Sequence, residues 1–170
     1  MGLDMYLQIR KSEYISHKEV ESHPELIEPA IEAIRKAGEG FIEKETVYEV
    51  GYWRKANAIH AWFIDECADG VDECQRIYVP VEKLAELKEK IQKIFAESEP
   101  EARNKIAAEE LPVREGFFFG TYEYDEWYYR DLERTLTIVD GVLDAMEKLK
   151  VKAEEDRWKY DYRVEYQASW

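Results

Sequence analysis

Strict alternation of apolar and polar residues occurs near both ends of the chain. Apolar side chains occupy every second position from Leu3 to Ile9, and again from Tyr160 to Tyr166. A period of two is typical of a half-buried β-strand. Shorter strands are predicted at residues 46–50 and 76–79. Residues 11–24 are polar and without a clear period, so an irregular segment is expected there.

Helical spacing of apolar positions predicts four helices and a fifth short one. They are expected around residues 26–34, from Gly51 to about Cys67, over residues 80–95, over residues 102–111, and from Asp125 to Lys150. The last carries apolar or small side chains at intervals of four and three from Tyr128 to Leu149, the pattern of a packed helix seam. Asp125 is a suitable residue to cap its start.

The segment from Gly51 to Phe63 is the most distinctive of these elements. Wound as a helix, it places Trp53, Asn57 and His60 on one stripe, with Arg54 beside that stripe and Lys55 pointing elsewhere. Gly51 is a suitable N-cap for this helix. The aromatic run bounded by Gly116 and Gly120 is too short for a helix and predicts a buried strand.

Strands and helices thus alternate along the chain, but the last strand has one polar face and no glycine-rich phosphate-binding turn follows any strand. The pattern predicts an α+β fold, a small, mostly antiparallel sheet with about four helices packed on it. No internal repeat or linker is apparent, so residues 1–170 are expected to form a single domain.

Composition restricts the class of protein. The apolar fraction is 45% over 170 residues, which is enough for a folded core. No apolar run reaches the roughly 18 residues that span a bilayer, and the start lacks the pattern of a signal peptide. We therefore expect a cytoplasmic protein that does not bind membranes. The oligomeric state does not follow from the sequence.

The net charge of −14 argues against direct nucleic-acid binding, which requires a basic surface. The charge is spread along the chain, as in many acidic proteins. The alternative is an acidic surface that imitates a polyanion and occupies the DNA-binding groove of a partner.

Metal binding and catalysis have weak support. His60, Cys67 and Cys74 are seven residues apart, which is not the close pairing of a zinc site. Seven residues along a helix also place His60 about 10 Å from Cys67, too far for direct activation of the thiol. No metal, no cofactor and no catalytic residue are predicted. An enzyme that uses His60 with an acidic residue stays open as a less favoured alternative.

Ligand binding is the better-supported chemistry. Arg54 and His60 can hold an anionic group, Asn57 can recognise a polar edge, and Trp53 can stack on a ring. The loop that enters the long helix offers a second wall. We therefore predict a pocket between helix 51–64 and segment 116–129, with these candidate ligand-binding residues: Trp53, Arg54, Asn57, His60, Tyr122, Glu123, Tyr124 and Asp125.

Structural roles would also explain these residues. Arg54 can pair with Glu123 or Asp125 and thereby fix the helix to the loop. His60 can be a buried histidine that is satisfied by hydrogen bonds within the core.

The chain resembles a family of uncharacterised small proteins from bacteriophages and prophages. The matching segments are Met1–Leu7, Gly51–Phe63, Gly116–Leu132 and Tyr166–Trp170, about a quarter of the chain. The family usually has Ser-Thr after the second glycine, where this chain has Thr121-Tyr122, so the hydroxyl-rich loop is altered.

The resemblance implies a phage accessory protein and names no catalytic residue. With the pocket, it leads us to expect a non-enzymatic protein that binds or sequesters a small polar ligand, for example one that resembles a nucleotide. The alternative is an acidic interaction protein that inhibits a host enzyme or a DNA-binding protein.

Overall fold

The fold is taken from a computed structural model that describes residues 2–16, 18–23, 28–38, 41–116, 120–155 and 159–170. In chain order the elements are β1 (Asp4–Ser16), the 3-10 helix η1 (Val20–Ser22), α1 (Glu28–Ala37), β2 (Phe41–Arg54), α2 (Asn57–Cys67), β3 (Ile77–Tyr78), α3 (Val81–Ala96), α4 (Pro100–Glu110), α5 (Glu126–Glu155) and β4 (Tyr160–Ser169). The predicted α+β class is confirmed.

The sheet has the strand order β2-β1-β4-β3, and every pairing in it is antiparallel. The first strand is longer than the alternation predicts. Lys11 to Glu13 pair with both β2 and β4, and Tyr14 to Ser16 pair with β2 alone. The expectation of an irregular segment directly after residue 10 is therefore wrong. Cross-strand partners on both sides of Lys11 to Glu13, and on one side of Tyr14 to Ser16, hold these residues in the extended conformation.

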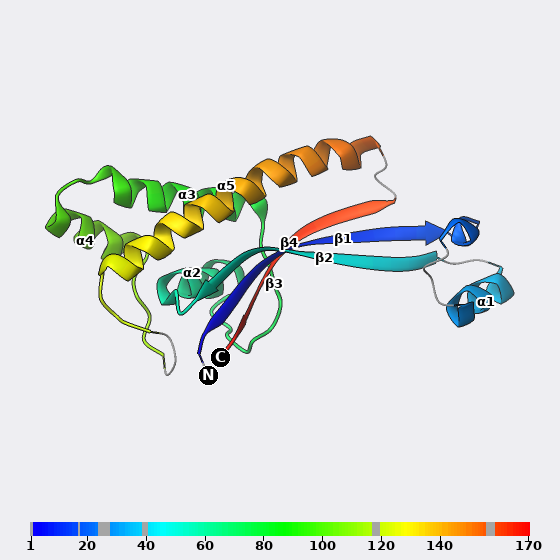
Figure 1. The fold of residues 1–170 in the computed structure, drawn as a ribbon, viewed down its shortest axis with the longest axis horizontal. Coiled ribbons are helices and arrows are strands. Elements are labelled where there is room, and N and C mark those ends of the chain that lie inside the picture. The colour runs from blue at the N-terminus through cyan, green and yellow to red at the C-terminus, as the bar shows by residue number, and fades with distance from the viewer. Residues whose placement is uncertain (1, 17, 24–27, 39–40, 117–119, 156–158) are drawn as a thin grey trace.

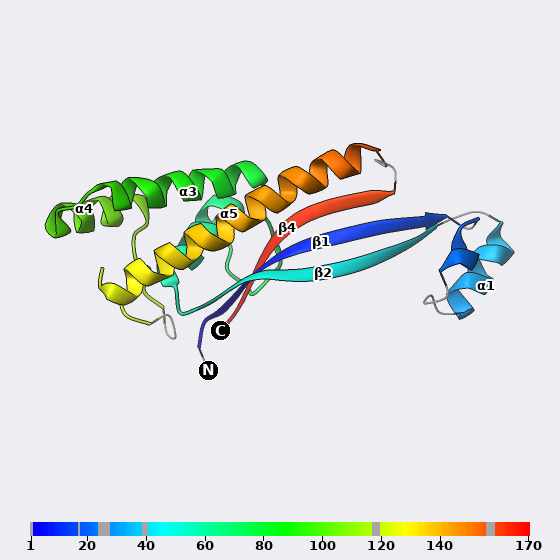
Figure 2. The same ribbon diagram turned by 45° about the horizontal axis from the view of Figure 1, so that its top comes forward.

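The larger helices lie to one side of the sheet, whereas α1 lies at its far end (Figure 1). In Figures 1 and 2, α3 and α5 run side by side. Figure 1 shows α2 below α5. The ring of Phe63 on α2 stacks on Tyr166 of β4, with centroids 4.0 Å apart and planes at 12°. The largest fully buried core side chains include Leu3, Met5, Leu7, Trp53, Ile59, Phe63, Leu84, Leu87, Ile91 and Tyr166.

The strands continue beyond this core as a projecting arm. β1 and β2 extend to the short helix α1 at its tip (Figure 1). There a second, separate hydrophobic cluster joins Ile15, Val20 and Ile31, with Ile42 packed against it. Between the two clusters the sheet carries polar pairs of β1 and β2, with Lys11 opposite Thr46 and Glu13 opposite Lys44.

The segment Gly51–Arg54 is a strand and not the start of a helix, so the prediction that a helix begins at Gly51 is wrong. Gly51 pairs with Leu7 and Arg54 with Asp4 in the sheet. Gly51 and Trp53 are buried, whereas Tyr52 is half-buried and Arg54 exposed. This period of two belongs to a strand, and it was hidden because it spans only four residues before a helix that is buried all around.

Gly51 is therefore not an N-cap but a point of close packing between β2 and α5. A Cβ atom at this position would lie 2.6 Å from Cγ2 of Ile138, 3.2 Å from the ring of Trp53 and 3.3 Å from Cβ of Leu7. Only glycine fits under the helix here.

We expect Gly51→Ala to lower the free energy of unfolding by about 1–3 kcal/mol, the usual cost of overpacking a core. Chemical denaturation would measure the change. Gly141→Ala is the matched control, because a Cβ atom there meets nothing within 4 Å and alanine favours the helix by about 1 kcal/mol. A Gly51→Ala protein as stable as the wild type would contradict this packing.

The helix α2 is buried on all sides, since every residue from Asn57 to Ile64 is buried. The two-faced helix expected from the sequence is thus wrong, because α2 is enclosed between the sheet and other helices. The long helix agrees better with its prediction. Asp125 caps α5, accepting hydrogen bonds from the backbone N–H groups of Trp127 and Tyr128 at 2.9 and 3.0 Å.

The strand predicted between Gly116 and Gly120 is not seen at either glycine, and residues 117–119 lie outside the described part of the chain. Among the described helices, none combines the length and the apolar run that a bilayer crossing needs.

Candidate functional site

A cavity of about 670 Å³ lies where the β2–α2 turn meets the loop before α5 and the first turns of α5. Its size is in the range of small-molecule sites, about 300–1,000 Å³. The lining residues are Arg54, Lys55, Ala56, Asn57, Ala58, Ile59, Val113, Gly116, Gly120, Thr121, Tyr122, Glu123, Trp127, Tyr128, Asp131 and Leu132.

The β2–α2 turn presents two cations to this cavity. Lys55 has a positive φ of 62°, which turns the chain out of the sheet, and its backbone N–H donates to the carbonyl of Leu3 at 2.8 Å. Gly120, with φ +94°, approaches so closely that a Cβ atom there would lie 3.2 Å from the carbonyl oxygen of Lys55. The turn and the loop are thus in direct contact, and both are held in place.

Asn57, at the beginning of α2, is hydrogen-bonded at two points to the segment between α4 and α5. Its Nδ2 donates to the carbonyl of Thr121 at 2.7 Å, and its Oδ1 accepts from the N–H of Arg114 at 3.2 Å. No described side chain caps α2, whose first turn, Ala58 and Ile59, lines the cavity. Its free N–H groups carry a partial positive charge.

Aromatic rings form another part of the wall. The Tyr122 hydroxyl donates to the carbonyl of Gly116 at 2.8 Å, which closes the loop on itself. Trp127 is 65% exposed, an unusual position for the largest apolar side chain. The guanidinium of Arg130 lies over its ring, 4.9 Å from the centroid.

The charges of the cavity are mixed and mutually unpaired. Within the described part of the chain, no ion pair joins Arg54 or Lys55 to Glu123, Asp131 or any other residue. Burial raises the pKa of Asp131 to about 6, although Arg134 and Arg130 act to lower it.

Four of the eight predicted ligand residues line the cavity: Arg54, Asn57, Tyr122 and Glu123. The structural alternative for Arg54 does not hold within the described residues, where it pairs with neither Glu123 nor Asp125. The other four, Trp53, His60, Tyr124 and Asp125, do not line it.

Trp53 points into the core and not into the cavity, because it lies on a strand. It is 1% exposed, and its Nε1 donates to Oγ1 of Thr135 at 2.9 Å. Tyr124 packs edge-on against Tyr128, with centroids 5.0 Å apart. Asp125 uses its carboxylate to cap α5.

His60 is a buried, hydrogen-bonded histidine outside the cavity wall. Its Nε2 lies 2.9 Å from Oδ2 of Asp72, and its Nδ1 lies 2.7 Å from the hydroxyl of Tyr166. A carboxylate only accepts, so Nε2 carries the hydrogen and Nδ1 accepts the tyrosine O–H. Burial lowers the pKa of His60, and Asp72 only partly opposes this effect. The imidazole joins α2, the loop after it and β4.

The cavity wall also includes Lys55, Trp127, Tyr128 and Asp131, which are not among the ligand-binding residues predicted from the sequence. Lys55 was placed on the wrong face by the assumption of a continuous helix. Trp127 and Asp131 are four residues apart, one helical turn, and this spacing was a signal that both face the same side.

The cysteines give no indication of chemistry. Burial raises the pKa of the Cys67 thiol to about 11, which disfavours the reactive thiolate. In the part of the chain that the structure describes, no three or more His, Cys, Asp or Glu side chains are grouped as metal ligands.

No protein-family model, curated protein or solved structure matches this chain. The resemblance to phage proteins therefore stays a prediction.

Proposed function

We propose that this protein binds a small polar molecule with an anionic group in the cavity between the β2–α2 turn and the start of α5, without transforming it. The observation that carries the proposal is the pair of cations at the cavity, Arg54 and Lys55, which no described acidic side chain neutralises. The anion would also meet the free N–H groups at the start of α2.

The remaining wall suits a ligand with a flat ring. Tyr122 and Trp127 offer ring faces, Leu132 and Val113 offer apolar contact, and the backbone of the loop offers polar groups. A nucleotide-like molecule meets this description. Sequestering such a compound from a host is a role that fits the phage setting implied by the sequence resemblance.

The net charge of −14 opposes the approach of an anion. Screening limits this repulsion, because the Debye length at physiological salt is about 8 Å. Local cations within the cavity then dominate binding at short range.

Native mass spectrometry of the protein purified from a bacterial host would test the proposal. We expect a co-purifying small molecule, and we expect Arg54→Ala with Lys55→Ala to lose it. The physical reason is that removal of both cations leaves the anionic group without a counter-charge.

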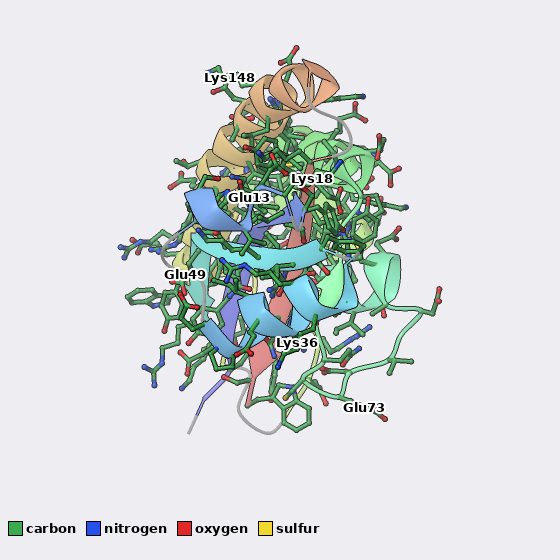
Figure 3. All side chains as sticks on the ribbon, turned by 90° about the vertical axis from the view of Figure 1, so that its right-hand side faces the viewer. Glu13, Lys18, Lys36, Glu49, Glu73 and Lys148 are labelled. Atoms are coloured by element: carbon green, nitrogen blue, oxygen red, sulfur yellow. The ribbon has the colours of Figure 1, made fainter. Side chains whose placement is uncertain are left out.

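Lys36→Ala with Lys148→Ala is the matched control. It also removes two positive charges, but from α1 and from α5, where both side chains are largely exposed (Figure 3). Retention of the compound in the cavity variant, or its loss in the control, would contradict the proposal.

The second candidate is an acidic interaction protein that inhibits a host enzyme or a DNA-binding protein. It is favoured by the position of β2 as the outermost strand of the sheet, with Glu43, Glu45 and Glu49 exposed along it and Val47 44% exposed. Purification as a bare chain, or with only a stoichiometric protein partner, would favour this candidate over ligand binding.

A further inference from the structure

Asp131 places a carboxylate at the cavity that has no partner among the described residues. It lies on α5 between Tyr128 and Leu132, which are 7% and 0% exposed, and is half-buried beside them. Its backbone carbonyl accepts from Oγ1 of Thr135 at 2.6 Å. The carboxylate, in contrast, has no hydrogen bond or ion pair with another described residue.

The neighbouring cations are close but do not pair with it. Arg134 and Arg130 interact with Asp131 electrostatically, yet neither forms a salt bridge with it, and Arg130 lies instead over the ring of Trp127. The oxygens of Asp131 are not fully buried, but partial burial weakens the hydration of a carboxylate and so favours a positively charged donor there. Because Asp131 lines the cavity, a partner for its carboxylate can approach from there.

We infer that the ligand is a zwitterion, whose positively charged nitrogen pairs with Asp131 while its anionic group pairs with Arg54 and Lys55. This inference rests on the proposed function and narrows its ligand class. Glu123, exposed at the same cavity, would add to the attraction for the nitrogen.

Charge balance supports a zwitterion over either singly charged alternative. A simple anion would face Asp131 and Glu123 as like charges, and a simple cation would face Arg54 and Lys55. A zwitterion offers each pair one group of opposite charge. It also has no net charge, so the overall −14 of the protein does not oppose its approach.

The test uses three indole compounds that differ in the charged groups they carry: tryptophan has an ammonium and a carboxylate group, tryptamine only the ammonium group, and indole-3-propionate only the carboxylate. Their binding to the wild-type protein, to Asp131→Asn and to Arg54→Ala with Lys55→Ala would be measured by NMR titration at neutral pH. Asparagine keeps the size of the side chain, and the melting temperature would show that the variant is folded.

We expect tryptophan to bind the wild type most tightly. Asp131→Asn should weaken tryptophan roughly 10- to 100-fold, as expected for loss of a charged hydrogen bond, and should weaken tryptamine similarly. Indole-3-propionate should bind this variant as well as or better than the wild type. Arg54→Ala with Lys55→Ala should weaken the binding of tryptophan and of indole-3-propionate, but not the binding of tryptamine.

The possible results distinguish failure of the zwitterion hypothesis from failure of the proposed anion site. If indole-3-propionate binds through Arg54 and Lys55, but tryptophan binds no better and Asp131→Asn changes nothing, the zwitterion is wrong and the anion site stands. If none of the three compounds binds, the inference is overturned, while the co-purified compound decides the proposed function independently.

Discussion

Replacing Trp53 with alanine is expected to lower the free energy of unfolding by about 3–5 kcal/mol, the usual cost of removing a buried tryptophan. Trp53 is 1% exposed and lies 6.2 Å from the ring of Phe63, centroid to centroid. Its indole also donates to Thr135, so the change removes a buried hydrogen bond between β2 and α5. Urea denaturation would measure the effect.

Trp127→Ala is the control for this prediction, because the same side chain is removed from a position that is 65% exposed. We expect a change within about 0.5 kcal/mol, typical of surface sites. If Trp53→Ala proved as mild as Trp127→Ala, then Trp53 would not be a core residue, and the ligand-binding role predicted for it from the sequence would be open again.

His60→Ala is expected to destabilise the fold by about 2–5 kcal/mol at pH 7.5. The change opens a cavity beside Tyr166, and it leaves the tyrosine hydroxyl and the Asp72 carboxylate without their shared partner. Melting temperatures of both proteins would establish the cost.

The size of this loss should depend on pH. Burial holds the pKa of His60 in the folded protein below the value of about 6.5 expected in the unfolded chain. The unfolded state therefore binds a proton more readily, so the contribution of His60 is complete above pH 6.5 and declines as the pH falls through the interval below it. The difference in stability between wild type and His60→Ala should shrink from pH 7.5 to pH 5.

Other groups that titrate in this range, Asp131 included, are present in both proteins and largely cancel in the difference. A gap that stayed constant or widened toward pH 5 would contradict a neutral, buried His60. It would point instead to a protonated imidazole stabilised by Asp72.

Much of the fold follows from periodicity in the sequence. The alternation at both ends corresponds to the central strands β1 and β4, and the seam from Tyr128 to Val142 corresponds to the buried side of α5. These predictions are confirmed because each element buries one face only. The helix after Arg54 is buried all around and carries no such period, so its start was placed six residues too early, at Gly51 and not at Asn57.

The site was predictable only in outline. The two segments that line the cavity were identified from their residue types, because Arg, Asn and Tyr are unusual between apolar residues. The direction of each side chain depended on the strand–turn–helix boundary, and that boundary is set by pairing with β1, which lies some 50 residues away. A continuous helix places Trp53 at the cavity and Lys55 away from it, whereas in the structure Trp53 is in the core and Lys55 lines the cavity.

The arm with its own small cluster of Ile15, Val20, Ile31 and Ile42 has a thermodynamic consequence. Because polar rows of the sheet separate this cluster from the main core, little apolar contact couples the two. The tip is then a cooperative unit of its own, able to open while the domain stays folded. Such an opening would leave the cavity intact at the other end of the sheet.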